Sequence, residues 1–379
     1  MRINSGRVLL RSVLAGFIVV FSLTSGFALD RGKPTSTPAL RPRSTSATYK
    51  IDVGLEGEVY PFFANYASLQ RPQERDWGTV SVTVTNSTSS PLQNRISVQV
   101  MGWSDEEVQT AEMAAGEVRT YLFAPTFWPR LYSNREIAAG TALVNVRDLS
   151  GKLIFTQTVP VRLRSADDIY WGPRFEYAPF IASWVTPHDP LVEKVLSQAK
   201  EFTPGRRLPG YESSKNAAQQ ERSTYIQAEA IYRALHAMGL SYVKSSLAFG
   251  GHAELSERVR TPRETLNDVS ANCIDGAVMY ASLFENLGME PIVVLVPRHA
   301  YVGLRVAPNS VTYLFIETSL TGRGTFQAAV RSAESGLARY RNSQIVRIPI
   351  SDARQAGIYP MPEATSMLDA GKPVLRSLN

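Results

Sequence analysis

Between residues 49 and 164 the chain alternates hydrophobic and polar side chains with a period of two. The alternation is clearest over residues 79–86, where valines are separated by serine and threonine and the polar run NSTSSP begins at the last position. A period of two predicts a half-buried β-strand, and a polar run rich in serine predicts a turn. The same pattern recurs over residues 95–103, 117–125, 141–148 and 153–163. Strands separated by short turns, with no helical period between them, predict an antiparallel β-sandwich.

After residue 173 the hydrophobic spacing becomes that of helices. Residues 189–202 place apolar side chains at helical spacing behind Asp189, a favoured N-cap, and Pro190, which fits the first helical turn. Further helices are predicted over residues 217–238 and 325–338, and strands over 291–317 and 344–350. Helices followed by antiparallel strands predict an α+β domain.

The chain is therefore expected to hold two folded domains, with three segments outside them. The predicted boundaries are 1–28 for a signal peptide, 29–48 for a disordered linker, 49–166 for an immunoglobulin-like β-sandwich, 174–362 for the α+β domain and 363–379 for a C-terminal tail. The linker is rich in Pro, Ser, Thr and Arg, and it has too few apolar side chains to offset the entropy of ordering. The remaining length of about 330 residues exceeds what one typical core holds.

The first 28 residues have the pattern of an export signal. Three arginines precede an apolar run that extends from Val13 to about Ala28, and the run ends in the small residues of SGFA, which fit cleavage after Ala28. The run is short for a membrane span. We therefore expect a periplasmic or secreted protein with no stable membrane span after signal removal. Anchoring in the inner membrane through an uncleaved signal is the alternative.

The charge distribution and the single cysteine exclude several classes of protein. The net charge is +6, but residues 1–50 hold eight basic residues and one acidic residue, so the rest of the chain has a net charge of −1. No basic face for nucleic acid is therefore expected. One cysteine excludes an intramolecular disulfide. No Cys/His/Asp cluster has metal-ligand spacing and no glycine loop has the phosphate-binding pattern, so no metal or cofactor is predicted.

The single cysteine, Cys273, begins a predicted helix. The residues after it form one apolar stripe up to Gly288, and Asn272 or Ser270 is placed to cap the helix. In the first turn of a helix, the dipole and the free N–H groups favour a thiolate. A small buried and inert cysteine is the alternative that the helix alone leaves open.

A histidine and a glutamate follow on two neighbouring predicted strands. Residues 291–296 form an apolar run, and residues 297–298 separate it from a hairpin that we expect to turn at residues 307–309. With this three-residue loop, His299 lies directly opposite Glu317 on the same face, with Cβ atoms about 5 Å apart. A four-residue loop would place the two on opposite faces. The predicted register therefore allows a cysteine nucleophile, a histidine base and an orienting carboxylate.

The order of cysteine, histidine and acid on a helix and two strands resembles the transglutaminase-like branch of the papain-like fold. Residues 260–304 resemble the R-x-P-x-E-x-L approach and the G-x-C-x-D helix of bacterial members, since they contain RTPRETL and ANCID. The runs FIETSLTG, TFQAAV and DARQAGIYPMP resemble the strand of the acid and the C-terminal extension, so the resemblance covers about residues 225–362. It implies Cys273 as nucleophile, His299 as base and Glu317 as the third member.

Four residues at three places differ from the family pattern. Ala271 and Asn272 stand where a glycine commonly precedes the cysteine, and Arg298 stands where a glycine often precedes the histidine. Glu317 stands where transglutaminases proper mostly use aspartate.

Two functions are compatible with this sequence. The resemblance implies an exported cysteine-dependent acyl-transfer enzyme that acts on peptide or isopeptide bonds of protein or peptide substrates, including those of the cell envelope, with hydrolysis favoured over cross-linking. The alternative is a catalytically inactive binding or scaffold protein of the cell envelope with the same fold, which the non-glycine neighbours favour. Retention of all three triad residues favours the enzyme.

Other polar residues near the motif have less specific expectations. Asp275 is expected either to complement the helix dipole in the first turn or to contact the segment from Arg260 to Glu264, and Glu264 is expected to hold its own loop. His252 lies in a glycine-rich loop, where it is a minor candidate for lining the cleft. His188 and His236 are expected at a helix flank and on a helix surface.

Overall fold

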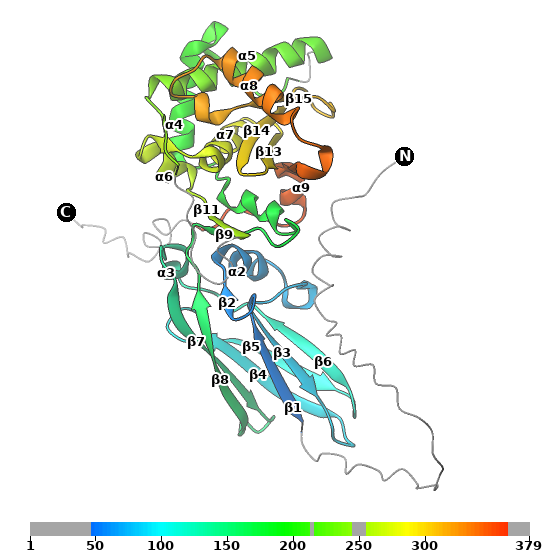
Figure 1. Cartoon of the computed structure of the whole chain (residues 1–379). Coiled ribbons are helices and arrows are strands. Elements are labelled where there is room, and N and C mark those ends of the chain that lie inside the picture. Colours follow the sequence, from blue (N-terminus) through cyan, green and yellow to red (C-terminus); the bar gives the residue numbers. More distant parts are fainter. Residues whose placement is uncertain (1–46, 213–215, 245–254, 363–379) are drawn as a thin grey trace, which may run out of the picture. The chain divides into compact units, whose positions relative to one another are not determined.

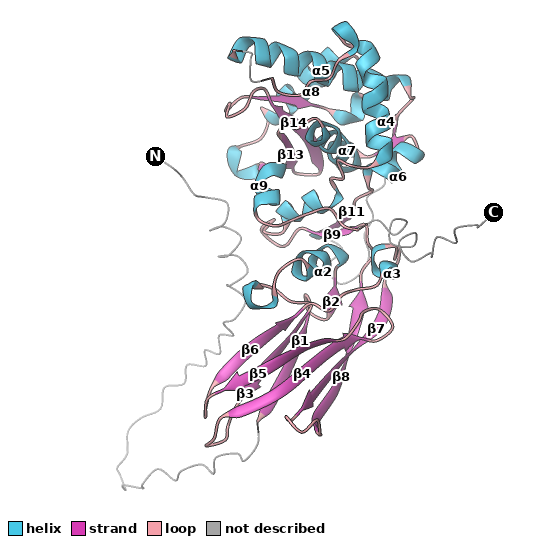
Figure 2. Ribbon diagram, turned by 180° about the vertical axis from the view of Figure 1, so that it is seen from behind, coloured by secondary structure: helices cyan, strands magenta, loops and turns pink. Residues whose placement is uncertain are grey.

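The computed structural model describes residues 47–212, 216–244 and 255–362. Over these residues the protein is a mixed α+β structure with several antiparallel sheets (Figures 1 and 2). The chain divides into two compact units between Arg164 and Ser165. The predicted signal peptide and C-terminal tail, and the predicted linker up to residue 46, lie outside the described residues. None of the described helices is both long enough and apolar enough to cross a bilayer.

The first unit contains two sheets. Its strands are β1 (Thr48–Val53), β2 (Glu58–Val59), β3 (Val80–Thr85), β4 (Leu92–Val100), β5 (Glu107–Met113), β6 (Val118–Phe123), β7 (Ala138–Arg147) and β8 (Leu153–Leu163). One sheet has the antiparallel order β1-β3-β6, and the other has the order β2-β8-β7-β4-β5, in which only the β2–β8 pair is parallel. The alternate valines of β3 are fully buried, as their period of two predicts. Each of the five predicted strands corresponds to a strand of these sheets.

This unit also contains elements that the sequence pattern does not predict. The helices α2 (Pro61–Ser68) and α3 (Pro129–Tyr132) lie between strands, so the expectation of no helix in this region is wrong. All residues of α2 except its last are buried, so its composition is apolar all round and has no stripe to reveal a helix. Strand β5 was missed because only Ala111 and Met113 are buried in its otherwise polar sequence.

The second unit is built on a four-stranded antiparallel sheet in the order β15-β14-β13-β16. Its strands are β13 (Pro291–Val296), β14 (His299–Arg305), β15 (Tyr313–Ile316) and β16 (Val346–Pro349). The α-helices are α4 (Pro190–Ala199), α5 (Ala217–Ala237), α6 (Pro262–Asn267), α7 (Cys273–Asn286), α8 (Phe326–Leu337) and α9 (Ile350–Gln355). Two small sheets pair β9 (Asp168–Tyr170) with β11 (Ser256–Arg258), antiparallel, and β10 (Ser241–Tyr242) with β12 (Ser270–Ala271), parallel.

Helix α7 forms the centre of the second unit. It packs against β13 and β14 (Figure 1), and every residue from Ile274 to Phe284 is buried. The helix ends where Gly288 takes the left-handed conformation, with φ of 68°, as the sequence predicts. Because the helix is enclosed on all sides, the position of its first residue, Cys273, is fixed by the core.

Candidate active site

Cys273 is the first residue of α7, and it is partly exposed. The preceding residue, Asn272, is the N-cap: its side chain accepts a hydrogen bond from the N–H of Asp275 at 2.8 Å. In return, the Asp275 carboxylate accepts a bond from the N–H of Asn272 at 3.2 Å. This reciprocal arrangement satisfies two backbone donors at the helix start. Asn272 therefore has a structural function directly before the cysteine.

The Asp275 carboxylate also joins α7 to the segment that precedes it in the unit. It is fully buried, and it accepts hydrogen bonds from the backbone N–H of Arg260 at 2.8 Å and from the Nε of Arg260 at 2.9 Å. Burial raises the pKa of Asp275, and the bonds from Arg260 oppose that rise. The expected contact between Asp275 and the approach segment is confirmed. Glu264 closes a capping box with Thr261 at the start of α6, so it holds its own loop as expected.

His299 begins β14, directly after a two-residue turn. Val296 and His299 are paired across the turn, and Arg298 has a φ of 64°. This left-handed conformation favours glycine and costs other residues about 1–2 kcal/mol. The backbone at this position would therefore suit a glycine. The side chain of Arg298 is exposed.

The predicted register of the hairpin that carries Glu317 is wrong. Val302 pairs with Ile316, so Glu317 is displaced by two residues from the position directly opposite His299. The reason is that the loop is longer than predicted: it contains the five residues 307–311, where three were expected. Because the shift is an even number of residues, the histidine and the glutamate still lie on the same face of the sheet.

The side chains of His299 and Glu317 meet. The Nε2 atom of His299 lies 2.7 Å from Oε2 of Glu317, whose side chain is almost completely buried. The other carboxylate oxygen, Oε1, accepts a hydrogen bond from the N–H of Ser319 at 3.1 Å, which fixes the orientation of the carboxylate. The side chain of Cys273 lies close enough to His299 to raise its pKa. Since Nε2 is occupied by Glu317, Nδ1 is the ring nitrogen left for the thiol. The structure therefore brings the three predicted residues together.

The electrostatics of the three residues favour a charged imidazole. Burial lowers the pKa of His299, but the hydrogen bonds with Cys273 and Glu317 outweigh burial and raise it to about 10. Burial raises the pKa of Glu317, but the bond and the charge of His299 more than offset this, so that the pKa falls below its usual value. Near pH 7 the carboxylate is therefore ionised and the imidazole protonated.

A glycine of α7 allows the segment after Glu317 to approach the cysteine. The Oγ1 of Thr318 donates a hydrogen bond to the carbonyl of Cys273 at 3.4 Å. A β-carbon on Gly276 would lie 2.5 Å from Oγ1 of Thr318 and 2.9 Å from its Cβ. Only glycine therefore permits this close contact between α7 and the residue next to the triad acid.

The substitution Gly276→Ala is expected to lower the free energy of unfolding by about 1–3 kcal/mol, because the added methyl group overpacks the contact with Thr318. Urea unfolding of the variant measures the loss. Adding Thr318→Ala removes the closest clashing atom, Oγ1, but keeps the Cβ, so the double variant is expected to regain part of the stability. A Gly276→Ala protein as stable as the wild type would show that the contact with Thr318 does not require glycine at position 276.

Two residues near the cysteine were missed by sequence reasoning. Tyr242 pairs with Ala271 in the parallel β10–β12 sheet, which places it beside the start of α7. Burial first, and then the charges of Cys273 and Glu317, raise the pKa of Tyr242. Glu257, in β11, is the second. Neither residue has a signal in the sequence pattern, since the strands that place them are only two or three residues long.

The remaining histidines lie elsewhere or outside the description. His188 is exposed just before Asp189, the N-cap of α4, and His236 is exposed on α5 with Nδ1 2.7 Å from the carbonyl of Thr321. His252 lies outside the described residues. Across residues 47–212, 216–244 and 255–362, no three His, Cys, Asp or Glu side chains gather as metal ligands.

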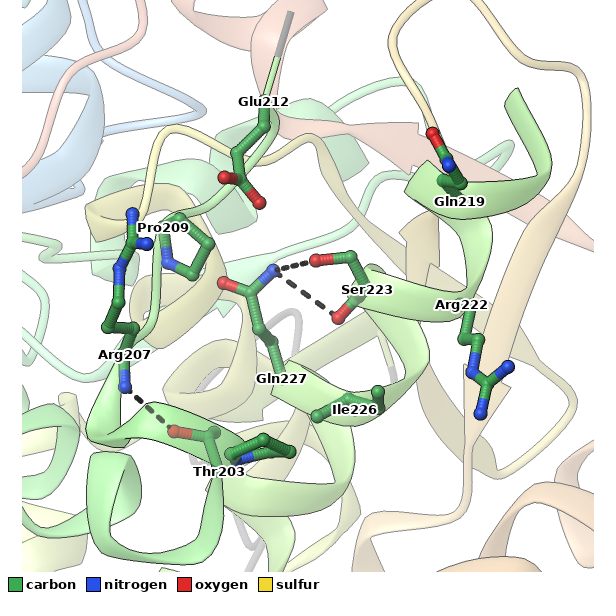
Figure 3. A pocket seen from close by; sticks show the side chains of 10 residues that line it. Thr203, Arg207, Pro209, Glu212, Gln219, Arg222, Ser223, Ile226 and Gln227 are labelled. Atoms are coloured by element: carbon green, nitrogen blue, oxygen red, sulfur yellow. Dashed lines mark hydrogen bonds between the residues drawn. The ribbon is translucent and has the colours of Figure 1, made fainter. Parts of the chain in front are cut away.

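A pocket of about 510 Å³ lies along the first turns of α5 (Figure 3). It is lined by Thr203, Pro204, Arg207, Pro209, Glu212, Gln219, Arg222, Ser223, Ile226 and Gln227. Next to it, the hydroxyls of Tyr211 and Thr224 donate hydrogen bonds to the carbonyls of Arg305 and Val306. These carbonyls are at the end of β14 that is opposite to His299, roughly 20 Å along a seven-residue strand. The pocket is therefore separate from the triad.

Comparisons of the chain with protein-family models and with curated proteins identified no relative. A scan of protein-family models found no match to the chain, and a search of curated proteins found none either.

Proposed function

We propose that the protein is an exported, cysteine-dependent acyl-transfer enzyme whose second unit is a transglutaminase-like domain of the papain-like fold. The observation that carries the proposal is the Cys273–His299–Glu317 arrangement, with 2.7 Å between His299 Nε2 and Glu317 Oε2. Cys273 begins helix α7, His299 begins strand β14 and Glu317 follows strand β15, and this order of elements supports the proposal. The first unit is proposed to be an immunoglobulin-like sandwich that positions the enzyme or binds a protein partner in the cell envelope.

In this mechanism the thiolate of Cys273 attacks the carbonyl carbon of a peptide or isopeptide bond. Imidazolium His299 donates its proton to the leaving nitrogen as the C–N bond breaks, which leaves a thioester on the cysteine. Water then attacks the thioester and gives a proton to His299, and the carboxylic acid leaves as the thiolate of Cys273 and the imidazolium of His299 are restored. Glu317 holds the ring with Nδ1 toward the sulfur throughout. A primary amine in place of water would give cross-linking, and the family resemblance favours water.

The inactive scaffold is the second candidate, and two observations favour the enzyme over it. Asn272, one departure from the family pattern, caps the helix of the nucleophile. Arg298, another departure, adopts the turn conformation with an exposed side chain. Neither departure removes a group that the reaction needs.

The proposal is tested by incubating the full chain with a peptide library, with and without a biotinylated primary amine. Mass spectrometry then scores cleaved peptides and peptides that carry the amine. We expect cleaved products to dominate in both samples, because water is the favoured acceptor. Dominant amine incorporation would assign cross-linking in place of hydrolysis. A library left unchanged under both conditions would contradict the enzyme and support the scaffold.

A further inference from the structure

Tyr301 is a buried aromatic residue beside the candidate site that the proposed mechanism does not use. It lies two residues after His299 on β14, so the two side chains project from the same face of the sheet. Their rings are in contact, with 4.6 Å between the centroids and an angle of 87° between the ring planes. This is the edge-to-face arrangement that aromatic pairs prefer. Tyr301 therefore packs directly against the imidazole of His299.

The contact with Glu317 does not by itself fix the plane of the His299 ring. The carboxylate holds only one ring atom, Nε2, and the torsion between the β-carbon and the ring restrains a histidine weakly. The side chain of His299 is 24% exposed, so it is not enclosed on every side by the core. Rotation of the ring about that torsion would carry Nδ1 away from its direction in the structure. A second ring packed at a right angle opposes the rotation, because the turned imidazole would collide with it.

Tyr301 is itself held in place by packing. It is 5% exposed, and it belongs to a buried cluster with Ile292, Val294 and Val296 of β13 and Ala333 of α8. Among the described residues its hydroxyl has no hydrogen-bond partner. The position of the ring is therefore set by the side chains around it and not by a polar contact.

A glycine of α8 leaves the space that the Tyr301 hydroxyl occupies. A β-carbon on Gly336 would lie 2.2 Å from the hydroxyl oxygen and 3.1 Å from Cζ of Tyr301. The φ of Gly336 is not in the left-handed region, so the helix backbone would accept alanine, which is the better helix former. What glycine provides at this position is therefore space for the tyrosine.

We propose that Tyr301 is a positioning residue for the acyl-transfer reaction, because its ring, seated against Gly336 of α8, fixes the plane of the His299 imidazole. The link to the reaction rests on the proposed function, whereas the restraint on the histidine rests on the ring contact alone. The hydroxyl of Tyr301 has no part in the restraint. The position therefore requires an aromatic ring, and phenylalanine should replace tyrosine.

The mobility of the His299 ring gives a direct test, because NMR relaxation of histidines labelled with ¹³C at Cε1 yields an order parameter for each ring. We expect a value near the rigid limit of about 0.85 in the wild type and in Tyr301→Phe, and below about 0.6 in Tyr301→Leu. His236 on α5 is the internal control, since its ring lies against the carbonyl of Thr321 and should not respond. A His299 ring as rigid in Tyr301→Leu as in the wild type would overturn the proposal. An equal fall at His236 would show a general loosening and would also overturn it.

The space at Gly336 gives a second test, which also applies if Tyr301→Leu fails to fold. Gly336→Ala should displace the Tyr301 ring and lower the order parameter of His299. Adding Tyr301→Phe removes the clashing oxygen and should restore most of the value, although Cζ stays close to the new methyl group. Ser335→Ala is the matched control, because Ser335 is exposed on the same helix and should leave the value unchanged. A double variant that recovers nothing would contradict a restraint that acts through Tyr301.

The relaxation measurements need no turnover, so their result is independent of the peptide library. If peptides are cleaved, Tyr301→Leu should lower kcat about ten-fold at nearly constant KM, and Tyr301→Phe should stay within about two-fold of the wild type. A mobile His299 ring with an unchanged kcat would overturn the role of Tyr301 in the reaction. A ring held by Tyr301 in a protein that leaves every peptide intact would overturn the proposed function and keep the restraint on His299.

Discussion

Cys273→Ala is expected to have no measurable amide turnover, a fall of at least about 10⁴-fold from the wild type. The chain has no second thiol that could replace the nucleophile. Neither the helix cap at Asn272 nor the His299–Glu317 bond depends on the sulfur, so the variant should keep its fold. Turnover of the peptides that the wild type cleaves, with unfolding measured in parallel, checks both expectations.

Two further variants separate loss of chemistry from loss of structure. His299→Ala should be nearly as inactive as Cys273→Ala, and the double variant no worse than either, because members of a triad act as one unit. Arg298→Gly changes the residue next to the histidine to one that suits its left-handed backbone, and it should keep the activity. Activity in Cys273→Ala equal to that of the wild type would end the interpretation of this site as catalytic.

Asp275→Ala is expected to lower the free energy of unfolding by about 3–5 kcal/mol. The reason is that the buried carboxylate accepts bonds from the Nε and the backbone N–H of Arg260 and from the N–H of Asn272. Its removal leaves these donors without their acceptor and the guanidinium without its buried partner. Urea denaturation of the full chain measures the loss.

The control for this prediction is Asp268, which contacts the same guanidinium at 3.3 Å but has 62% of its side chain exposed. Asp268→Ala should therefore cost at most about 1 kcal/mol. Should Asp275→Ala fail to fold, Asp275→Asn keeps one acceptor oxygen and should show an intermediate loss. Equal costs for the Asp275 and Asp268 variants would contradict the importance assigned to burial.

The helix that begins at Cys273 could be predicted from the sequence because its signals are local. An N-cap at Asn272, an apolar stripe and Gly288 together specify a start and an end, and the structure places both as predicted. The direct opposition of His299 and Glu317 could not be predicted in the same way. The register depends on the length of a loop, and residues 307–311 contain no feature that distinguishes five loop residues from three. The two side chains still lie on the same face of the sheet, because the observed register differs from the predicted one by an even number of residues.

Contacts made by very short strands were beyond prediction for another reason. Tyr242 is brought to Ala271 by a parallel pair of two-residue strands, and Glu257 lies in a strand of three. Segments this short show no measurable period, so only tertiary packing positions them. The apolar helix α2 was missed because burial on every side removes the stripe that identifies a helix.

The enclosure of α7 has a consequence for how the protein is inactivated. Because Ile274 to Phe284 are all buried between other elements, the helix cannot separate from its neighbours unless the unit opens as a whole. A local fluctuation that frees the nucleophile while the rest stays folded is therefore strongly disfavoured. Thermal loss of the candidate site and cooperative melting of its unit become one event, so the arrangement around Cys273 lasts only as long as the core.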